Sequence, residues 1–261
     1  MTNNPNNKEY IVSYLTMRKA VGWLGMLLPF ILLAGNYCIN HLRLFNNTWL
    51  VNLCCSKSYT FGNSFKSSIS HYYYTTVGEL FTGTLCAVAL FMFCYKGHPK
   101  RKSDRGLSDS VMTNLAGIFA MGVVVFPTGE ETVDLISDNL RGFVSTTQTG
   151  YIHFTCAALF FITLAFISMV NFRRSQDPSK FGKGWHDNRY LWCGIVMISC
   201  LLLIFIYVQF FQKDGSFLEE YIPPVFCLEA IALMAFGTSW LTKGQADFMY
   251  IPKKLGLKKK S

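Results

Sequence analysis

Residues 190–211 read YLWCGIVMISCLLLIFIYVQFF and contain no charged side chain. A helix needs about 20 apolar residues to cross the roughly 30 Å hydrocarbon core of a bilayer. The segment therefore predicts a transmembrane helix. Because it is apolar nearly all round, we expect it to be the most lipid-exposed helix of the protein.

Five further segments have the same character, and the chain is 51% hydrophobic, 16% aromatic and only 15% charged. These proportions exclude a disordered chain and argue against a soluble domain. A β-barrel would show short alternating strands instead of long apolar runs. We predict an all-α polytopic membrane protein built as a six-helix transmembrane bundle. The predicted spans cover residues 20–40, 76–96, 109–128, 150–171, 190–211 and 222–241.

Lysine and arginine are distributed unevenly over the two sides of these spans. If the N-terminus is cytoplasmic, 19 of the 24 basic residues fall in cytoplasmic segments and 5 in outer loops. Because cytoplasmic loops are enriched in Lys and Arg, we predict that both termini are cytoplasmic. The chain then divides into a cytoplasmic N-terminal segment 1–19, a six-span domain 20–241 and a basic cytoplasmic tail 242–261.

The net charge of +9 follows from this asymmetry. Basic residues near anionic headgroups contribute about 1 kcal/mol each, so we predict membrane lipids as partners and no nucleic-acid binding. The last residues, Lys258 to Ser261, resemble a dilysine retrieval signal of the endoplasmic reticulum. That signal has meaning only in a eukaryote, and a bacterial chain would lie in the plasma or inner membrane. The sequence therefore predicts an integral multi-pass protein without fixing its membrane.

Three ionisable residues lie within the predicted spans. Each such group costs a few kcal/mol to insert, so all three are functional candidates. At about 1.5 Å per residue from the outer end of each span, Glu79 and His153 lie roughly 5 Å deep and Glu229 roughly 10 Å deep. We expect nothing comparable on the basic inner side. The sequence predicts an outward-facing polar pocket formed by Glu79, His153 and Glu229 with His71 and Tyr72.

Within this pocket, His153 is the candidate partner of Glu229, because a deep carboxylate must be protonated, paired or hydrated. Tyr72, Tyr73 and Tyr74 would form an aromatic rim at the headgroup level. A purely structural alternative stays open, in which the two deep residues hydrogen-bond across helices and Glu79 caps a helix or reaches the interface. A cationic or hydroxyl-bearing lipid headgroup would suit the acids better than a bare phosphate.

The local signatures of several enzyme classes are missing. Catalytic zinc takes three close protein ligands, commonly with a His pair at i, i+3 or i+4 or an HExxH arrangement, and the sequence has neither. No G-x-S-x-G, phosphate-loop or G-x-G-x-x-G motif occurs. Ser70 and His71 are not part of a catalytic triad, because the side chains of adjacent residues point apart. We therefore predict no metal site, and the catalytic residues and cofactors stay unknown.

Glycine and proline positions predict how the spans pack. Pro29 should kink the first span, and Pro127 should end the third near the outer surface. Small residues let transmembrane helices approach closely. The glycines expected to do so are Gly22, Gly25, Gly83, Gly117, Gly122 and Gly237.

Several different short motifs follow one another along the chain. They are Ile69-Ser70, Phe81-x-Gly83, Asn114 with Ala116-Gly117, Ile152-His153, and Glu229 with Phe236-Gly237. This order resembles the six-span family of damage-regulated autophagy modulators, GPI-lipid remodelling factors and related uncharacterised membrane proteins, over most of residues 20–245. The resemblance implies lipid organisation, transport or remodelling and carries over no catalytic residue. His71 stands where that family commonly has an acid, so no carboxylate role is implied there.

Two other classes of membrane protein stay open. A metal-dependent intramembrane lipid hydrolase of the seven-span ceramidase and adiponectin-receptor type would need three His ligands, and the last span here has none. An ion- or proton-coupled transporter would use Glu229 as its titrating group. The sequence shows neither the internal repeats nor the paired broken helices typical of many transporters.

Overall fold

The computed structural model describes residues 5–42, 66–75, 77–97, 106–128, 146–173, 185–211 and 223–254. Three features of the sequence lie outside these residues. They are the N-x-T glycosylation motif Asn46-Asn47-Thr48, the predicted outer loop 129–149 with the acids Glu130, Glu131, Asp134 and Asp138, and the dilysine-like end Lys258 to Ser261.

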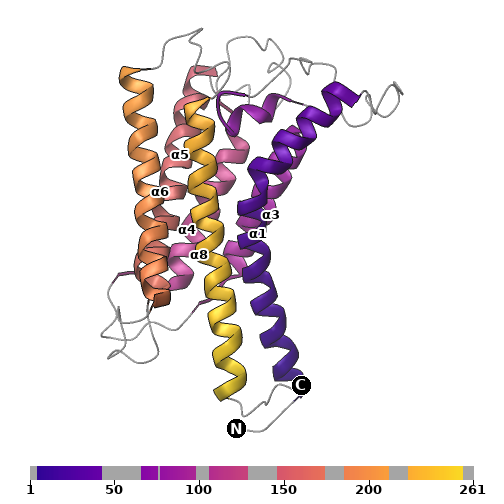
Figure 1. Ribbon diagram of the computed structural model, residues 1–261, viewed down its shortest axis with the longest axis vertical. Coiled ribbons are helices and arrows are strands. Elements are labelled where there is room, and N and C mark those ends of the chain that lie inside the picture. The colour runs from indigo at the N-terminus through magenta and orange to yellow at the C-terminus, as the bar shows by residue number, and fades with distance from the viewer. Residues whose placement is uncertain are drawn as a thin grey trace.

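The described residues form six α-helices and no strand, which confirms the all-α, six-helix prediction. The helices run side by side and alternate in direction (Figure 1). We call the end at which α1 begins and α8 ends the lower end, and the end that carries the short helix η1 the upper end. The helices are α1 (Pro5–Leu42), α3 (Gly78–Cys94), α4 (Asp109–Val125), α5 (Thr146–Phe166), α6 (Trp185–Phe210) and α8 (Pro224–Lys254), with the 3₁₀ helix η1 (Ser70–Tyr74) and the π-helix η3 (Ile167–Asn171).

Four of these helices are long and apolar enough to cross a membrane, within residues Leu15–Cys38, Gln148–Asn171, Asn188–Phe210 and Pro224–Gly244. The other two, α3 and α4, are apolar and have 17 residues each. Only 22% of the apolar window in α6 is buried, against 39–44% in the other three long helices. Among these four helices, α6 is therefore the one least covered by the rest of the protein, and its contact with lipid stays a prediction.

The two prolines act at different places. Pro29 lies inside α1, which continues through it and bends in its upper half (Figure 1). α4 ends at Val125, two residues before Pro127, as predicted. Its first turn is capped by Ser108, whose hydroxyl accepts a hydrogen bond from the amide of Val111 at 3.3 Å.

α1 and α8 pack closely because glycines face each other across their junction. A Cβ atom built on Gly237 would lie 2.6 Å from the carbonyl oxygen of Gly22, and one on Gly25 would lie 2.5 Å from the Phe236 ring. Gly117 and Gly122 likewise admit the side chains of Phe93 and Cys156. For Gly83 the packing prediction is wrong, because nothing lies within 4 Å of a Cβ built there.

Candidate functional site

The upper end of α8 is covered by residues 66–75, the segment that contains η1. The amide of Phe226, in the first turn of α8, donates a hydrogen bond to the carbonyl oxygen of Ser67 at 3.1 Å. The ring of Tyr72 packs on that of Phe226 with centroids 5.9 Å apart. This segment therefore forms a fixed roof over the helix that carries Glu229.

Glu229 lies one turn further along α8 and is half-buried. Its Oε2 atom accepts a hydrogen bond of 2.6 Å from the amide of Ile69. This bond ties the Glu229 side chain to the roof segment, 160 residues earlier in the sequence. The second carboxylate oxygen, Oε1, makes no hydrogen bond to a described residue.

His71 is the next ionisable group in the roof. Its Nδ1 atom lies 2.8 Å from the hydroxyl oxygen of Ser67 and 2.9 Å from that of Ser68. The hydroxyl of Ser68 also accepts a hydrogen bond from the amide of His71 at 3.2 Å. Two hydroxyls and an imidazole thus gather next to the residue whose amide holds Glu229.

His153 is almost completely buried, at 1% exposure, near the upper end of α5. Its Nδ1 atom lies 2.6 Å from the carbonyl oxygen of Phe126, so Nδ1 carries a proton and donates. Its Nε2 atom is buried and has no hydrogen-bond partner among the described residues. In a neutral ring that is protonated at Nδ1, the Nε2 atom is a hydrogen-bond acceptor.

The predicted pairing of Glu229 with His153 is not what the structure shows. Glu229 is held by the amide of Ile69, and His153 by the carbonyl of Phe126. Both are backbone groups at the ends of helices, where secondary structure leaves amides and carbonyls without partners. The two side chains nevertheless lie at the same end of the bundle.

The three tyrosines of η1 do not form a uniform rim. Tyr72 is fully buried and belongs to the core, and burial raises the pKa of its phenol, so the hydroxyl stays protonated at neutral pH. Tyr73 and Tyr74 are half-buried and pack edge to face at 5.2 Å. The hydroxyl of Tyr74 donates to the carbonyl oxygen of Thr128, which joins the roof to the end of α4.

Glu79 takes part in none of the hydrogen bonds described above. It is exposed, in the first turn of α3, where a carboxylate interacts favourably with the helix dipole. Its position matches the capping alternative better than a place inside a pocket.

The upper site comprises the Glu229 carboxylate, the His71 and His153 rings and the hydroxyls of Ser67 and Ser68. No group of three or more His, Cys, Asp or Glu that could hold a metal ion occurs among the residues described. The arrangement supplies hydrogen-bond acceptors and hydroxyl donors at the upper end of the bundle.

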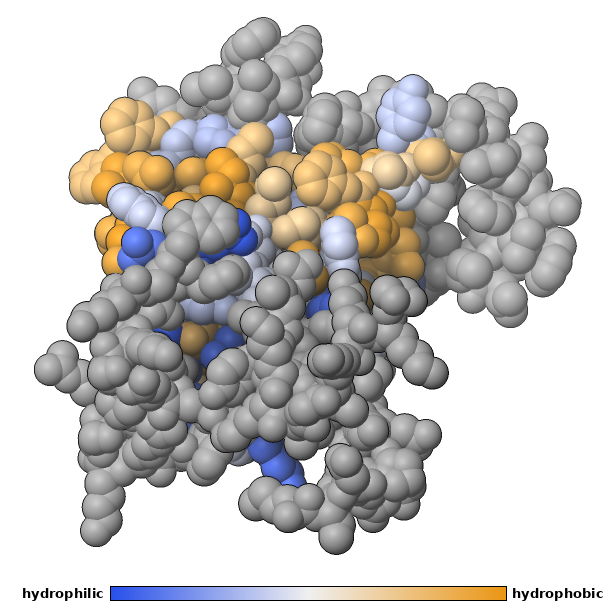
Figure 2. All heavy atoms as spheres, turned by 60° about the horizontal axis from the view of Figure 1, so that its bottom comes forward, coloured by the Kyte–Doolittle hydropathy of each residue, from blue (hydrophilic) through white to orange (hydrophobic). Residues whose placement is uncertain are grey.

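The lower end holds a second polar cluster, and the expectation that nothing comparable lies there is wrong. Arg18 is 2% exposed, Lys243 5% and Asp109 2%. In the sequence, Arg18 and Lys243 stand at the edges of apolar runs, where basic residues usually reach into the aqueous phase. In the bundle, the neighbouring helix ends cover them. Figure 2 turns this end forward and shows hydrophilic residues in several separate patches.

Hydrogen bonds connect this lower cluster across the bundle. Asn171, at the end of η3, donates to Oδ1 of Asp109 at 2.8 Å, and Lys243 donates to the carbonyl of Phe172 at 3.2 Å. The hydroxyls of Ser168 and Ser239 lie 2.7 Å apart. π-helical turns inside a longer helix frequently mark functional sites. Here η3 directs Ser168 and Asn171 toward α8 and α4.

Apolar helices of this length, arranged as a bundle, define an integral multi-pass membrane protein. Residues 1–241 match the profile of the family described as "Cation transporting ATPase, C-terminus", and the chain belongs to this family. Comparison with curated proteins and with solved structures gave no match.

Proposed function

We propose that this membrane protein binds the headgroup of an outer-leaflet lipid at its upper site and acts in lipid organisation, transport or remodelling. The observation that carries the proposal is the buried Nε2 atom of His153, an acceptor with no partner among the described residues, at the same end as the open Oε1 atom of Glu229. Leaving a buried polar atom unsatisfied costs about 1–3 kcal/mol, which a ligand hydroxyl or ammonium would recover.

The topology we propose has six spans and cytoplasmic termini. At 1.5 Å per residue, the 17 residues of α3 and α4 measure about 25 Å, near the lower limit for crossing a bilayer. All described basic side chains except Lys66 belong to the lower half, which supports placing that end in the cytoplasm. The upper site then faces the outer leaflet.

The resemblance in motif order to the damage-regulated autophagy modulators and GPI-lipid remodelling factors is in line with the same proposal. Ile69 and Glu229 belong to two of those motifs, and the structure brings them together through a hydrogen bond of 2.6 Å. His71 adds an imidazole at the position where that family commonly has an acid.

A second candidate is a role in cation transport, which the family of the chain favours. In that case Glu229 would bind or exchange the cation, because it is the acidic side chain described within the long spans. Metal cations in proteins take several oxygen ligands, so further ligands would have to join this carboxylate.

Glu229→Gln separates these candidates, because it removes the charge and keeps the volume. We expect the lipid that co-purifies with the protein to fall about tenfold, or about 1.4 kcal/mol, by quantitative lipid mass spectrometry. His153→Ala should lower it similarly. Glu79→Gln changes an exposed carboxylate in the first turn of α3 and should leave the bound lipid unchanged.

The same variants in proteoliposomes test cation transport. If Glu229→Gln abolishes cation or proton flux while the bound lipid stays at the wild-type amount, the lipid proposal fails and the transport candidate holds. If bound lipid is unchanged in both Glu229→Gln and His153→Ala and no flux is present, the two residues serve only to pack the bundle.

A further inference from the structure

The roof segment brings two serine hydroxyls into contact with one imidazole. Ser67 stands four residues before His71, and its hydroxyl oxygen lies 2.8 Å from the Nδ1 atom of the imidazole. The hydroxyl oxygen of Ser68 lies 2.9 Å from the same nitrogen. A hydroxyl within hydrogen-bond reach of a histidine nitrogen is the arrangement by which an imidazole activates serine as a nucleophile.

The exposure of the two serines differs and assigns them different roles. Ser67 and His71 are half-buried, so part of each side chain is open to the surroundings of the protein. Ser68 is 4% exposed, and its hydroxyl accepts a hydrogen bond from the amide of His71 at 3.2 Å. Ser67 is therefore placed to meet a substrate, whereas Ser68 is placed to hold the imidazole.

The position of Ser68 also suits the transfer of a proton. In a neutral ring protonated at Nε2, the Nδ1 atom has one lone pair, which accepts the hydroxyl hydrogen of Ser67. After this hydrogen has moved to Nδ1, the Ser68 oxygen at 2.9 Å can accept a hydrogen bond from it. Hydrogen bonds to a charged donor are stronger than those to a neutral one, so Ser68 stabilises the imidazolium.

The backbone around Ser67 is fixed to α8. The carbonyl oxygen of Ser67 accepts a hydrogen bond of 3.1 Å from the amide of Phe226. Two residues later, the amide of Ile69 donates to Glu229 at 2.6 Å. Both bonds use backbone atoms of the roof and leave its hydroxyl contacts unchanged. A nucleophile and a base held in this way are already oriented before a substrate arrives.

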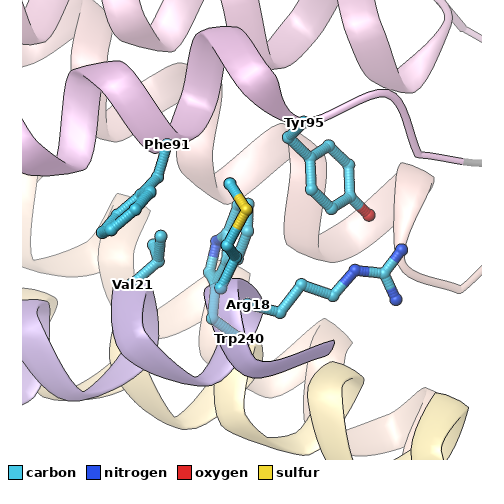
Figure 3. Close-up of a pocket in the computed structure, with 6 residues that line it drawn as sticks. Arg18, Val21, Phe91, Tyr95 and Trp240 are labelled. Carbon is cyan, nitrogen blue, oxygen red and sulfur yellow. The ribbon is translucent and has the colours of Figure 1, made fainter. Parts of the chain in front are cut away.

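A cavity at the lower end cannot serve as the place of reaction. It lies between α1, α3 and α8 and holds about 10 Å³, the room of about one water molecule. Figure 3 shows that Val21, Phe91 and Trp240 close most of it with apolar side chains. A lipid has to meet Ser67 and His71 from the surface of the upper end instead.

We propose that Ser67 and His71 form a catalytic dyad that hydrolyses a carboxylic ester of a membrane glycerolipid. Ser67 is the nucleophile, His71 the general base and Ser68 a positioning residue. The substrate class rests on the proposed function, which places a lipid headgroup at this site. In a glycerolipid the acyl esters lie next to the headgroup, at the level of the roof.

The reaction takes place in two balanced steps. The Ser67 oxygen bonds to the ester carbonyl carbon while Nδ1 of His71 takes the hydroxyl proton. The bond from that carbon to the glycerol oxygen breaks, the glycerol oxygen takes the proton from Nδ1, and the acyl group stays on Ser67. A water molecule then attacks the acyl group, its proton passes through Nδ1 to the Ser67 oxygen, and a fatty acid leaves.

A fluorophosphonate probe tests the nucleophile in the purified full chain, because it bonds to an activated serine with loss of fluoride. We expect labelling at Ser67, identified by mass spectrometry of the labelled peptide, and no labelling in Ser67→Ala. His71→Gln should slow the labelling about a hundredfold, as is typical when a general base is lost. Ser70→Ala changes a buried serine of the same segment and is the matched control, with labelling as fast as in the wild type.

Hydrolysis of dihexanoyl phosphatidylcholine tests the substrate class, measured as release of hexanoic acid. Ser67→Ala should abolish the release. His71→Gln should lower kcat about a hundredfold with little change in KM, because the base acts in the reaction rather than in binding. Ser68→Ala should lower kcat by a smaller factor, again with little change in KM, and a loss of folding alone would not produce this pattern.

The outcomes separate the dyad from the proposed function. Absence of labelling in the wild type, or equal labelling in the wild type and Ser67→Ala, overturns the dyad, while co-purified lipid would still support the binding function. Labelling at Ser67 in a protein that carries no lipid overturns the binding function and supports the dyad. Labelling at Ser67 without release of hexanoic acid overturns the ester assignment. If Ser67→Ala does not fold, the labelled position in the wild type decides by itself.

Discussion

The contact between α1 and α8 is tight enough that one added methyl group should separate the helices. A Cβ atom at position 237 would lie 2.6 Å from the carbonyl oxygen of Gly22, 2.9 Å from the Cβ atom of Met26 and 3.1 Å from its amide nitrogen. Two of these atoms are backbone and cannot rotate away. Overpacking of this kind typically costs about 1–3 kcal/mol, while alanine in place of a helical glycine gains about 1 kcal/mol.

Gly237→Ala should therefore lower the free energy of unfolding by up to about 2 kcal/mol. At about 2–4 °C per kcal/mol for a chain of this size, the Tm should fall by several degrees. The assay is thermal unfolding in detergent, followed by tryptophan fluorescence. Trp240 lies one turn away and Trp23 is next to Gly22 in the sequence.

Gly83→Ala is the matched control, because nothing lies within 4 Å of a Cβ built there. It gains helix propensity without a clash, so its Tm should be equal to that of the wild type or slightly higher. A Tm for Gly237→Ala as high as that of Gly83→Ala would refute the close approach of α1 and α8.

Two further predictions concern hydrogen bonds that join helices. Asn171→Ala removes the donor to the buried Asp109 and should cost about 1–3 kcal/mol, measured as a fall in Tm that Asn114→Ala, at an exposed position of α4, does not reproduce. Tyr74→Phe removes the bond to the Thr128 carbonyl and should cost about 1 kcal/mol. It should also speed amide hydrogen exchange in η1, and exchange at the wild-type rate would show that this bond does not hold the segment.

The sequence predicts the helices well because their signal is local. Each apolar run appears as a helix, and the limits differ mainly where polar turns continue the helix. α1 begins at Pro5 and α8 reaches Lys254, well beyond the apolar runs at 20–40 and 222–241. Hydropathy marks where a chain meets lipid and carries no information on where the backbone stops being helical.

The partners of the polar groups were not predictable in the same way. Glu229 is held by the amide of Ile69, 160 residues away, and a backbone amide has no signature in a sequence. Tyr72 lies in the core although it belongs to a run of aromatic residues typical of a membrane interface.

The lower cluster was missed for a related reason. Arg18 and Lys243 have the positions of ordinary flanking charges, and only the packing of neighbouring helix ends shows that they are buried. The Ser168–Ser239 contact and the π-helical turn of η3 are tertiary features that no periodicity in the sequence indicates.

The most direct test of the central claim is to map where a lipid contacts the upper site. A phospholipid with a photoactivatable group next to its headgroup is cross-linked to the protein in nanodiscs, and the labelled peptides are identified by mass spectrometry. The account predicts labelling concentrated in residues 66–75 and at the start of α8, and loss of that labelling in Glu229→Gln but not in Glu79→Gln. Labelling spread along the exposed face of α6, with the same pattern in both variants, would contradict it.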